Sequence, residues 1–158
     1  MDQTPRLQLD EQLCFSLYAA TNAVTRAYRP LLGDLGLTYP QYLVMLALWQ
    51  DGPSTIGSLA RRLGLPPNAL TPLLTRMEEA QWVRRRRDGT DRRVIHIELT
   101  ERGVRLRDAA AEAQADVECR TGLERERLVA LREELFALVR RMEGADALRA
   151  DARETERA

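Results

Sequence analysis

The stretch from residue 54 to residue 99 constrains this chain most, because two short helical patterns there are followed directly by two strand patterns. Gly64 ends the first helical pattern, and the second begins after Pro66 and Pro67. Two short helices joined by a tight glycine-containing turn are typical of a helix-turn-helix. The second helix would expose polar side chains suited to phosphates and base edges. These are Asn68, Thr71, Thr75 and Arg76.

The segment that follows, WVRRRRDGTDRRVIHIELT, changes to a period of two, which indicates a pair of strands. Asp88 and Gly89 form a strong hairpin signal between them. A basic hairpin directly after a helix-turn-helix is typical of a wing, although an ordinary solvated hairpin would have the same pattern. His96 falls on the polar face, where a solvated or phosphate-contacting role is favoured over metal binding. The candidate DNA-binding residues of the hairpin are Arg84, Arg85, Arg86, Arg92 and Arg93.

Charge is unevenly distributed along a chain whose net charge is zero. Residues 1–60 carry 3 arginines against 5 acidic residues, and residues 100–158 carry 12 against 14. Residues 61–99 carry 9 arginines against 5 acidic residues, so only this central part is basic. An anionic partner is therefore expected to bind there.

Helical patterns flank the central part on both sides. Asp10 is a plausible N-cap for a long amphipathic helix that ends near Gly33 to Gly36, covering about residues 9–34. Pro40 suits the first position of a second helix, whose run YLVMLALW is apolar on nearly every side and should be buried. Thr100 would cap the helix that follows the hairpin, with Gly103 tolerated early in it.

A heptad-like seam near the C-terminus predicts self-association. Steps of three and four residues join its apolar positions, which are Leu128, Leu131, Leu135, Leu138 and Met142. Such a seam cannot bury itself on a lone helix. We therefore expect a homodimer joined through helices at about 9–34 and 100–143. Residues 144–158 are charged and Ala-rich, and we expect them to be disordered.

Together these patterns predict one domain over residues 1–158, mainly α with a small β wing. A winged helix-turn-helix at about 39–99 is flanked by long N- and C-terminal dimerisation helices. The chain has no apolar run near 18 residues and no signal-peptide pattern, so a cytoplasmic protein without a membrane segment is expected. Two cysteines are too few for a secreted disulfide framework. No cluster suited to a metal is visible, and no cofactor is expected.

One cysteine, Cys14, lies in the first helical pattern close to several tyrosines in the sequence. Tyr18 is one turn away on the same face, and Tyr28 is displaced from Cys14 by only about 40° around the helix axis. Tyr39 lies beyond a glycine-containing break and would reach the thiol only from a partner chain or by the chain folding back. From these residues alone, a buried structural cysteine is the more common outcome.

The order of elements resembles the MarR family of winged-helix regulators over about residues 9–143. The hairpin carries Asp91 and Arg93 in the D-x-R arrangement typical of that family, followed by LTERG at the start of the next helix. The segments LDEQLCFSLYAA, LTYPQYLVMLALW and LTPLLTRME resemble the organic-hydroperoxide sensor branch, the OhrR regulators. The chain differs from those relatives in having Pro66, Pro67 and Asn68 where an aliphatic, Asp and Ser stretch is usual.

The resemblance implies a role for each matching position. Cys14 would be the thiol that peroxide oxidises, Tyr28 and Tyr39 would hydrogen-bond its sulfur, and Tyr18 would line the same pocket. Cys119 would resolve the oxidised thiol across the dimer. Arg93 would enter the minor groove, and the helix around residues 68–76 the major groove. One alternative remains for Cys119: it is an ordinary surface or packing residue of the helix. Oxidised Cys14 would then form its disulfide with a small cellular thiol.

The function expected is that of a dimeric repressor and not an enzyme. It would bind a pseudo-palindromic double-stranded DNA operator when reduced, and an organic hydroperoxide would release it by oxidising Cys14. The main alternative is a MarR-type repressor relieved by non-covalent binding of a small aromatic ligand. A thiol peroxidase would need a reductant site, and the sequence shows none.

Overall fold

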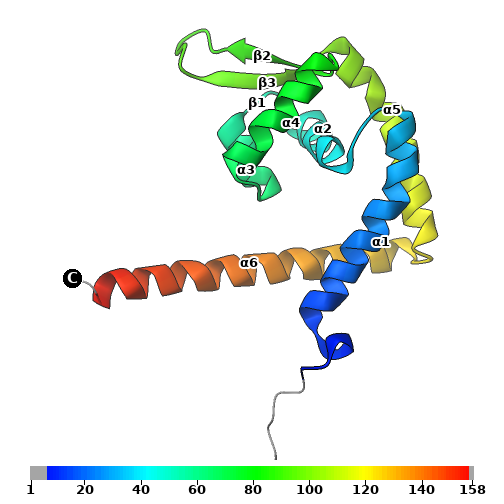
Figure 1. The fold of residues 1–158 in the computed structure, drawn as a ribbon, viewed down its shortest axis with the longest axis vertical. Helices are drawn as coiled ribbons and strands as arrows, with labels where there is room; N and C mark the ends of the chain where they lie inside the picture. Colours follow the sequence, from blue (N-terminus) through cyan, green and yellow to red (C-terminus); the bar gives the residue numbers. More distant parts are fainter. Residues whose placement is uncertain (1–6, 157–158) are drawn as a thin grey trace, which may run out of the picture. The chain divides into compact units, whose positions relative to one another are not determined.

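The computed structural model of the protein describes the backbone of residues 7–156 and the side chains of residues 7–144. Two compact units are present, Met1–Val117 and Glu118–Ala158. The predicted fold class is confirmed, since helices dominate and the only sheet in the described part is small (Figure 1). The elements are η1 (Leu9–Glu11), α1 (Leu13–Asp34), α2 (Tyr39–Asp51), β1 (Ser54–Thr55), α3 (Ile56–Leu63), α4 (Pro67–Glu79), β2 (Val83–Arg87), β3 (Ile95–Leu99), α5 (Glu101–Arg120) and α6 (Arg125–Glu156).

The long helix α1 begins at Leu13, two residues later than with an Asp10 cap, which would have placed the first helical residue at Glu11. Asp10 lies inside the short 3-10 turn η1, so the predicted cap is wrong. Gln12 is the N-cap, with an extended backbone at φ −90° and ψ 124°, and its side-chain amide donates to the Gln8 carbonyl at 3.1 Å. The α-helix therefore starts only after Gln12, which makes Cys14 the second residue of α1.

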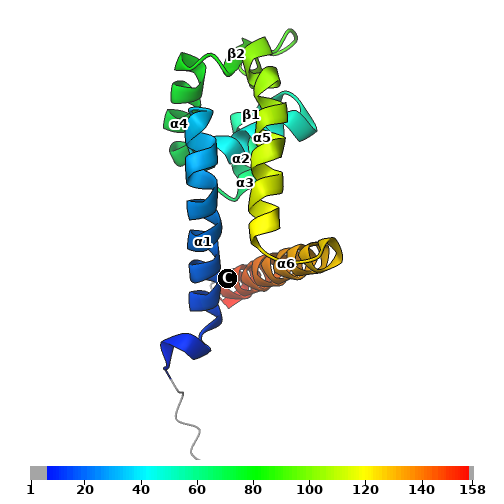
Figure 2. The ribbon, with the colours of Figure 1, turned by 90° about the vertical axis from the view of Figure 1, so that its right-hand side faces the viewer.

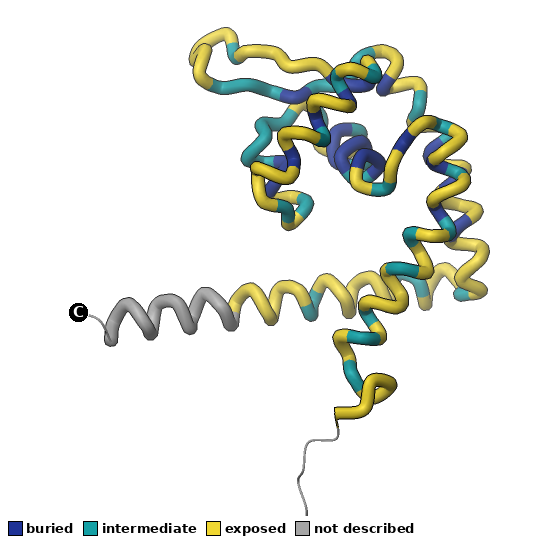
Figure 3. The backbone as a smooth tube through the Cα atoms, viewed as in Figure 1, coloured by how far each residue is buried: buried dark blue, intermediate teal, exposed yellow. Residues whose placement is uncertain are grey.

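The helix α2 forms the centre of the first unit, as its apolar run predicted (Figure 3). Thr38 caps it in a reciprocal capping box with Gln41, and Pro40 occupies the second helical position instead of the first. In the first unit, α1 and α5 run side by side (Figure 2), and both contribute to the core around α2. The largest fully buried side chains are Leu32, Met45, Leu48, Leu59, Leu70, Leu74, Met77, Ile97, Val44 and Val83.

The helix-turn-helix is confirmed as α3 and α4. Gly64 ends α3 in the left-handed region at φ 64°, which glycine adopts without steric cost. Asn68 does not cap α4, because the helix already begins at Pro67 with Pro66 as N-cap. The fixed φ of Pro67 favours the first helical position, and Pro66 has no polar side chain that could cap.

The hairpin is confirmed as β2 and β3, which pair antiparallel from Val83 opposite Leu99 to Arg87 opposite Ile95. The sheet has the order β1-β3-β2. β1 was not predicted, since two residues are too few to show a strand pattern. The turn between β2 and β3 spans residues 88–94 and is much longer than a tight Asp-Gly turn.

Thr100 joins the hairpin to α5 as predicted, and its hydroxyl oxygen accepts a hydrogen bond from the Gly103 N–H at 3.1 Å. The glycine is required and not merely tolerated. A Cβ at residue 103 would overlap the carbonyl oxygen of Trp82 and lie 3.2 Å from Leu99 Cδ2. The indole N–H of Trp49 donates to the Gly103 carbonyl at 3.0 Å, so α2, α5 and the hairpin meet at this residue.

In the second unit, α6 carries exposed apolar side chains along the predicted seam. Leu131, Leu135 and Met142 are 49%, 39% and 61% exposed, and the neighbouring Phe136 is 55% exposed. The backbone continues as helix to Glu156, whereas disorder was expected from residue 144. Ala, Arg and Glu dominate this segment and are strong helix formers. Side chains beyond residue 144 lie outside the described part, so the predicted disorder of residues 144–158 stays a prediction.

Among the described residues, no single helix is long and apolar enough to cross a membrane. The bent pair of α1 and α2, at 78°, would pass on length and composition alone.

Candidate functional site

The outward face of α4 carries the four polar residues that the sequence analysis selected. Asn68, Thr71, Thr75 and Arg76 are all exposed. The Thr71 hydroxyl donates to the Pro67 carbonyl and the Thr75 hydroxyl to the Thr71 carbonyl, each at 3.1 Å. Leu70, Leu74 and Met77 occupy the opposite face and are buried. The helix α4 is thus anchored by its apolar side and presents a polar one.

Arg85 connects the hairpin to α4. Its Nη2 donates to Thr75 Oγ1 at 3.3 Å, and its backbone N–H donates to Glu78 Oε1 at 3.3 Å. The Arg85 guanidinium also forms a 3.7 Å ion pair with Glu78. Arg85 therefore links the two elements, and the DNA contact predicted for it stays a prediction. Glu78 was not predicted as a site residue, because its partner Arg85 lies beside it only when β2 packs against α4.

Arg84 and Arg86 share one carboxylate on the other face of the hairpin. The Nε groups of Arg84 and Arg86 lie 2.6 Å and 2.9 Å from the two oxygens of Glu98, whose side chain is 12% exposed. Hydrogen bonds from Arg86 and then Arg84 hold the pKa of Glu98 below its ordinary value. Arg84 and Arg86 are therefore paired within the protein, and Glu98 was missed because its pairing follows from strand register.

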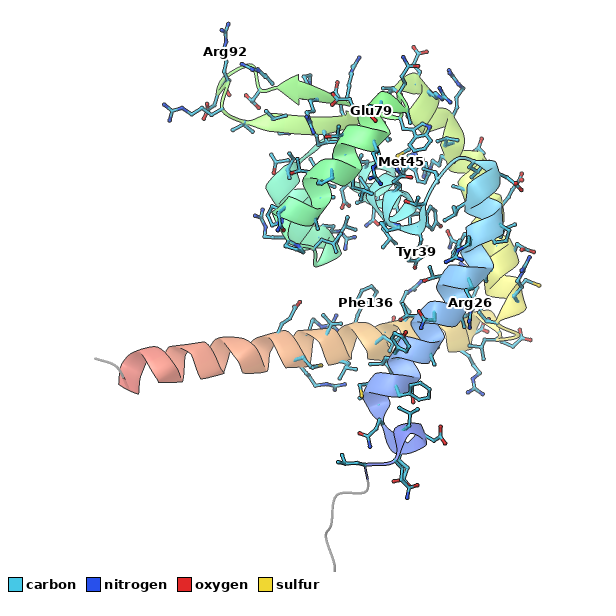
Figure 4. The ribbon with its side chains drawn as sticks, in the orientation of Figure 1. Arg26, Tyr39, Met45, Glu79, Arg92 and Phe136 are labelled. Atoms are coloured by element: carbon cyan, nitrogen blue, oxygen red, sulfur yellow. The ribbon has the colours of Figure 1, made fainter. Side chains whose placement is uncertain are left out.

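Arg92 and Arg93 lie in the turn at the tip of the hairpin, and both are exposed. Figure 4 shows Arg92 pointing away from the body of the unit. The N–H of Arg93 donates to Asp91 Oδ1 at 2.9 Å. Together with Arg76 on α4, these guanidinium groups form the part of the basic surface best placed to meet an external anion.

Cys14 is exposed near the start of α1, and Tyr18, one turn on, is 66% exposed. Tyr28 is on the same helix face but fourteen residues away. At 1.5 Å per residue, this separation is about 21 Å along the axis. Within one chain, Tyr28 therefore lies far from the thiol along the axis of α1, and the contact that the resemblance implies between them stays a prediction.

Three tyrosine rings form a cluster where α1 meets α2. The ring centroid of Tyr28 lies 5.6 Å from that of Tyr39 and 5.2 Å from that of Tyr42. Tyr28 and Tyr42 are buried, and burial raises the pKa of Tyr39 above its ordinary 10.0. The Tyr39 hydroxyl therefore keeps its proton and is a hydrogen-bond donor. The sequence analysis missed Tyr42, which lies three residues after Tyr39 on α2.

Cys119 is the second free thiol and lies at the C-terminal end of α5, where it is exposed. It belongs to the second unit, Glu118–Ala158, and Cys14 to the first. Residues 7–144 contain no group of three or more His, Cys, Asp or Glu side chains that could hold a metal ion.

A wide, open hollow of about 650 Å³ lies beside the hairpin at the start of α5. Both of its arginines already have carboxylate partners, because Arg84 pairs with Glu98 and Arg105 lies 3.7 Å from Glu101. The lining residues are Arg84, Leu99, Thr100, Glu101, Val104 and Arg105.

The arrangement of a buried α2, the helix pair α3 and α4, and the hairpin is matched by known proteins. The model of the MarR family matches residues 37–95. The organic hydroperoxide resistance transcriptional regulator of Bacillus subtilis is 42% identical over 106 residues, which cover 67% of this chain and 72% of that protein. The chain belongs to the MarR family.

Other members of the MarR family are similar as well. The HTH-type transcriptional regulator TtmR of Methylorubrum extorquens is 49% identical over 106 residues, which cover 65% of this chain but only 54% of that longer protein. A solved structure of reduced AbfR bound to DNA is 36% identical, with a TM-score of 0.70 over 85% of this chain and 94% of that one. A disulfide-formed structure of AbfR has a TM-score of 0.60, with 37% identity over 83% of this chain and 92% of that one.

Proposed function

We propose that this chain is a redox-sensing, DNA-binding transcriptional repressor that leaves its operator when an organic hydroperoxide oxidises Cys14. The observation that carries the proposal is an exposed thiol in the first turn of α1, in a chain 42% identical to an organic hydroperoxide resistance regulator. The protein would work in the cytoplasm as a homodimer, where it meets its operator.

DNA binding is supported by the basic, polar surface of α4 and the hairpin. The helix α4 would enter the major groove with Asn68, Thr71 and Arg76 toward the bases and phosphates. Arg92 and Arg93 would reach the adjacent minor groove. A dimer presents this surface twice, which suits a pseudo-palindromic operator. Of the hairpin arginines, Arg84, Arg85 and Arg86 would support the surface more than touch DNA, given their carboxylate partners.

The thiol chemistry begins with attack of the Cys14 thiolate on the distal oxygen of the hydroperoxide. The O–O bond breaks, an alkoxide leaves and takes up a proton to become the alcohol, and the sulfur becomes a sulfenic acid. A second thiol then attacks that sulfur, a disulfide forms, and water leaves. A negative charge near the N-terminus of a helix such as α1 is stabilised by the helix dipole.

The tyrosine donors Tyr28 and Tyr39 would have to reach the thiol from the partner subunit. Tyr28 is about 21 Å along α1 from Cys14 of the same chain, and Tyr39 packs against Tyr28. An antiparallel pairing of two α1 helices brings the N-terminal end of one to the C-terminal end of the other. Tyr28 and Tyr39 of the partner subunit would then donate to the Cys14 sulfur, and oxidation would break those bonds and shift the two α4 helices apart. Because half-site spacing on DNA is fixed, a small shift costs much affinity.

The deciding experiment compares wild type, Cys14→Ser and Cys119→Ser on a duplex selected by the reduced wild type from a randomised pool. Cumene hydroperoxide should release wild type and leave Cys14→Ser bound. Non-reducing electrophoresis should show a peroxide-dependent dimer band that Cys119→Ser lacks. Release of Cys14→Ser by the peroxide would contradict the proposed sensor. A band retained in Cys119→Ser would contradict only the role of Cys119.

The second candidate is a repressor relieved by a small aromatic ligand. The observation that favours it is the hollow beside α5, which is large enough for such a ligand. The hollow has few groups that would hold an aromatic carboxylate. Both of its arginines already pair with carboxylates of the protein, and its lining includes no aromatic side chain on which a ring could stack. This candidate predicts that Cys14→Ser leaves DNA on addition of an aromatic carboxylate without any oxidant.

A further inference from the structure

The turn between β2 and β3 is organised around one carboxylate that the proposed DNA contacts do not use. Asp88 Oδ1 accepts hydrogen bonds from the Thr90 hydroxyl at 2.6 Å, the Thr90 N–H at 2.8 Å and the Asp91 N–H at 3.3 Å. A single oxygen atom therefore fixes the backbone at two successive residues of an otherwise exposed turn.

The other oxygen of Asp88 is tied to the hairpin strand. His96 is the only histidine of the chain, and its Nε2 lies 3.2 Å from Asp88 Oδ2. An ionised carboxylate can only accept hydrogen bonds, so Nε2 of His96 must carry the proton. The carboxylate thus links the turn to β3 as well as to its own backbone.

A second carboxylate continues this network toward the arginines at the tip. The Asp91 N–H donates to Asp88, and Asp91 Oδ1 in turn accepts from the Arg93 N–H at 2.9 Å. Two main-chain hydrogen bonds close the turn, from the Asp88 N–H to the Val94 carbonyl at 2.9 Å and from the Val94 N–H to the Asp91 carbonyl at 3.0 Å. The backbone at Arg93 is therefore held by bonds that lead back to Asp88.

The Asp88 carboxylate is charged at neutral pH. Hydrogen bonds from the side chain and backbone of Thr90, and then from the backbone of Asp91, hold the pKa of Asp88 well below its usual range. Hydrogen bonds to an ionised acceptor are stronger than neutral ones. The turn is thus pinned throughout the neutral pH range.

We propose that Asp88 is the positioning residue of the wing tip, holding residues 88–94 in the conformation that presents Arg92 and Arg93 to the minor groove. The role rests on the DNA-binding part of the proposed function and is independent of Cys14. A loose turn would lose conformational freedom on binding, and an ordered one avoids that loss. Asp88 itself need not touch DNA.

The direction in which Asp88→Ala changes DNA affinity distinguishes a positioning role from a purely electrostatic one. Removing a negative charge near DNA should strengthen binding if charge alone matters. Positioning predicts the opposite: Asp88→Ala should weaken binding about tenfold, the loss expected from freeing one or two backbone residues. The measurement is fluorescence anisotropy on the selected duplex at one fixed salt concentration. Glu79→Ala, which removes an exposed carboxylate from α4, is the matched control and should bind as tightly as wild type or more tightly.

Three further tests exclude a general loss of structure as the cause of weaker binding by Asp88→Ala. In a chain carrying Arg92→Ala and Arg93→Ala, adding Asp88→Ala should change affinity no further, because the side chains it positions are gone. Amide hydrogen exchange at Thr90 and Asp91 should be faster in Asp88→Ala, with the thermal midpoint unchanged. Asp88→Asn keeps an acceptor oxygen and should recover part of the affinity.

Unchanged or tighter binding by Asp88→Ala would overturn the role of Asp88. The role would also be overturned if Asp88→Ala weakened DNA binding by the same factor in the chain that already carries Arg92→Ala and Arg93→Ala. If the reduced wild type selects no duplex at all, the DNA-binding proposal itself fails together with this role.

Discussion

Gly103 shows how a single residue joins three elements of the first unit. Its missing side chain lets α5 approach the Trp82 carbonyl, its N–H is capped by Thr100, and its carbonyl accepts from the Trp49 indole. The sequence predicted only that this glycine is tolerated early in the helix, because the carbonyl it must avoid lies twenty-one residues earlier in the chain. Long-range contact, and not local propensity, selects glycine here.

Gly103→Ala should therefore destabilise the protein strongly. The new Cβ would overlap the Trp82 carbonyl oxygen and lie 3.0 Å from its carbon, so the backbone of α5 has to move. We expect a loss in the free energy of unfolding at or above the upper end of the ~1–3 kcal/mol typical of overpacking. Urea denaturation measures it. Gly33→Ala on α1, where an added Cβ meets nothing within 4 Å, is the control and should stabilise by up to about 1 kcal/mol. Equal midpoints for the two variants would contradict the packing argument.

At the scale of elements, the periodicity of apolar residues predicted the helices and the hairpin. It did not predict features that depend on local backbone geometry or on contacts distant in the sequence. The helices α3 and α4 and the strands β2 and β3 are where the pattern placed them. β1 is too short to show a pattern, and the start of α1 was set by the backbone of Gln12. The periodicity of a helix gives the angle of a residue around the axis and not its position along the axis, so the shared face of Cys14 and Tyr28 does not show how far apart they lie.

The hairpin arginines show the same limit of sequence reasoning. A run of four arginines in β2 indicates positive charge, but only the register shows that Arg84 lies opposite Glu98. Arg85 meets Glu78 because β2 packs beside α4. The basic segment therefore contains Arg84, Arg85 and Arg86, which pair with carboxylates of the protein, and a second group, Arg92 and Arg93, in the turn at its tip. Sequence alone does not separate the two groups.

Glu98 should make the stability of the hairpin depend on pH. Its pKa is lowered in the folded protein from an unfolded value near 4.5, so its contribution is complete above that pH and is lost as the pH falls through the folded value. Between pH 5 and pH 3, the free energy of unfolding of wild type should fall more steeply than that of Glu98→Gln. Urea midpoints at several pH values test this.

The control for this prediction is Glu101→Gln, which removes an almost fully exposed carboxylate whose pair with Arg105 is 3.7 Å long. An exposed pair contributes little to stability. Glu101→Gln should therefore follow the wild-type pH profile. A Glu98→Gln profile parallel to wild type would mean that the Glu98 pairs do not stabilise the fold.

On the scale of the whole molecule, the two ends of the chain leave apolar surface that one subunit does not cover. Leu9 in η1 and Leu13 at the start of α1 are each 61% exposed, and α6 exposes Leu131 and Phe136. Proteins that work as monomers rarely leave so many large apolar side chains in contact with water. This surface lies away from α4 and the hairpin in the sequence, at the segments expected to form the dimer. A second copy of the chain is its natural partner.

Leu135→Asp tests this last inference, since it places a charge in the middle of the α6 seam. Burying a leucine contributes about 2 kcal/mol, and each subunit of a dimer loses that amount. The dimer dissociation constant should rise at least about a hundredfold, and sedimentation at micromolar concentration should show monomers. DNA affinity should fall as well, because a monomer reads only one half-site.

Arg140→Gln changes the charge of α6 by the same single unit, but it lies on the opposite face of the helix from Leu138, two residues away. It should remain a dimer with wild-type affinity for DNA. If Leu135→Asp also remained a dimer, the α6 seam would have to be covered within its own chain. The pairing of subunits would then depend on α1 alone, which in the proposed mechanism also brings Tyr28 of the partner subunit to Cys14.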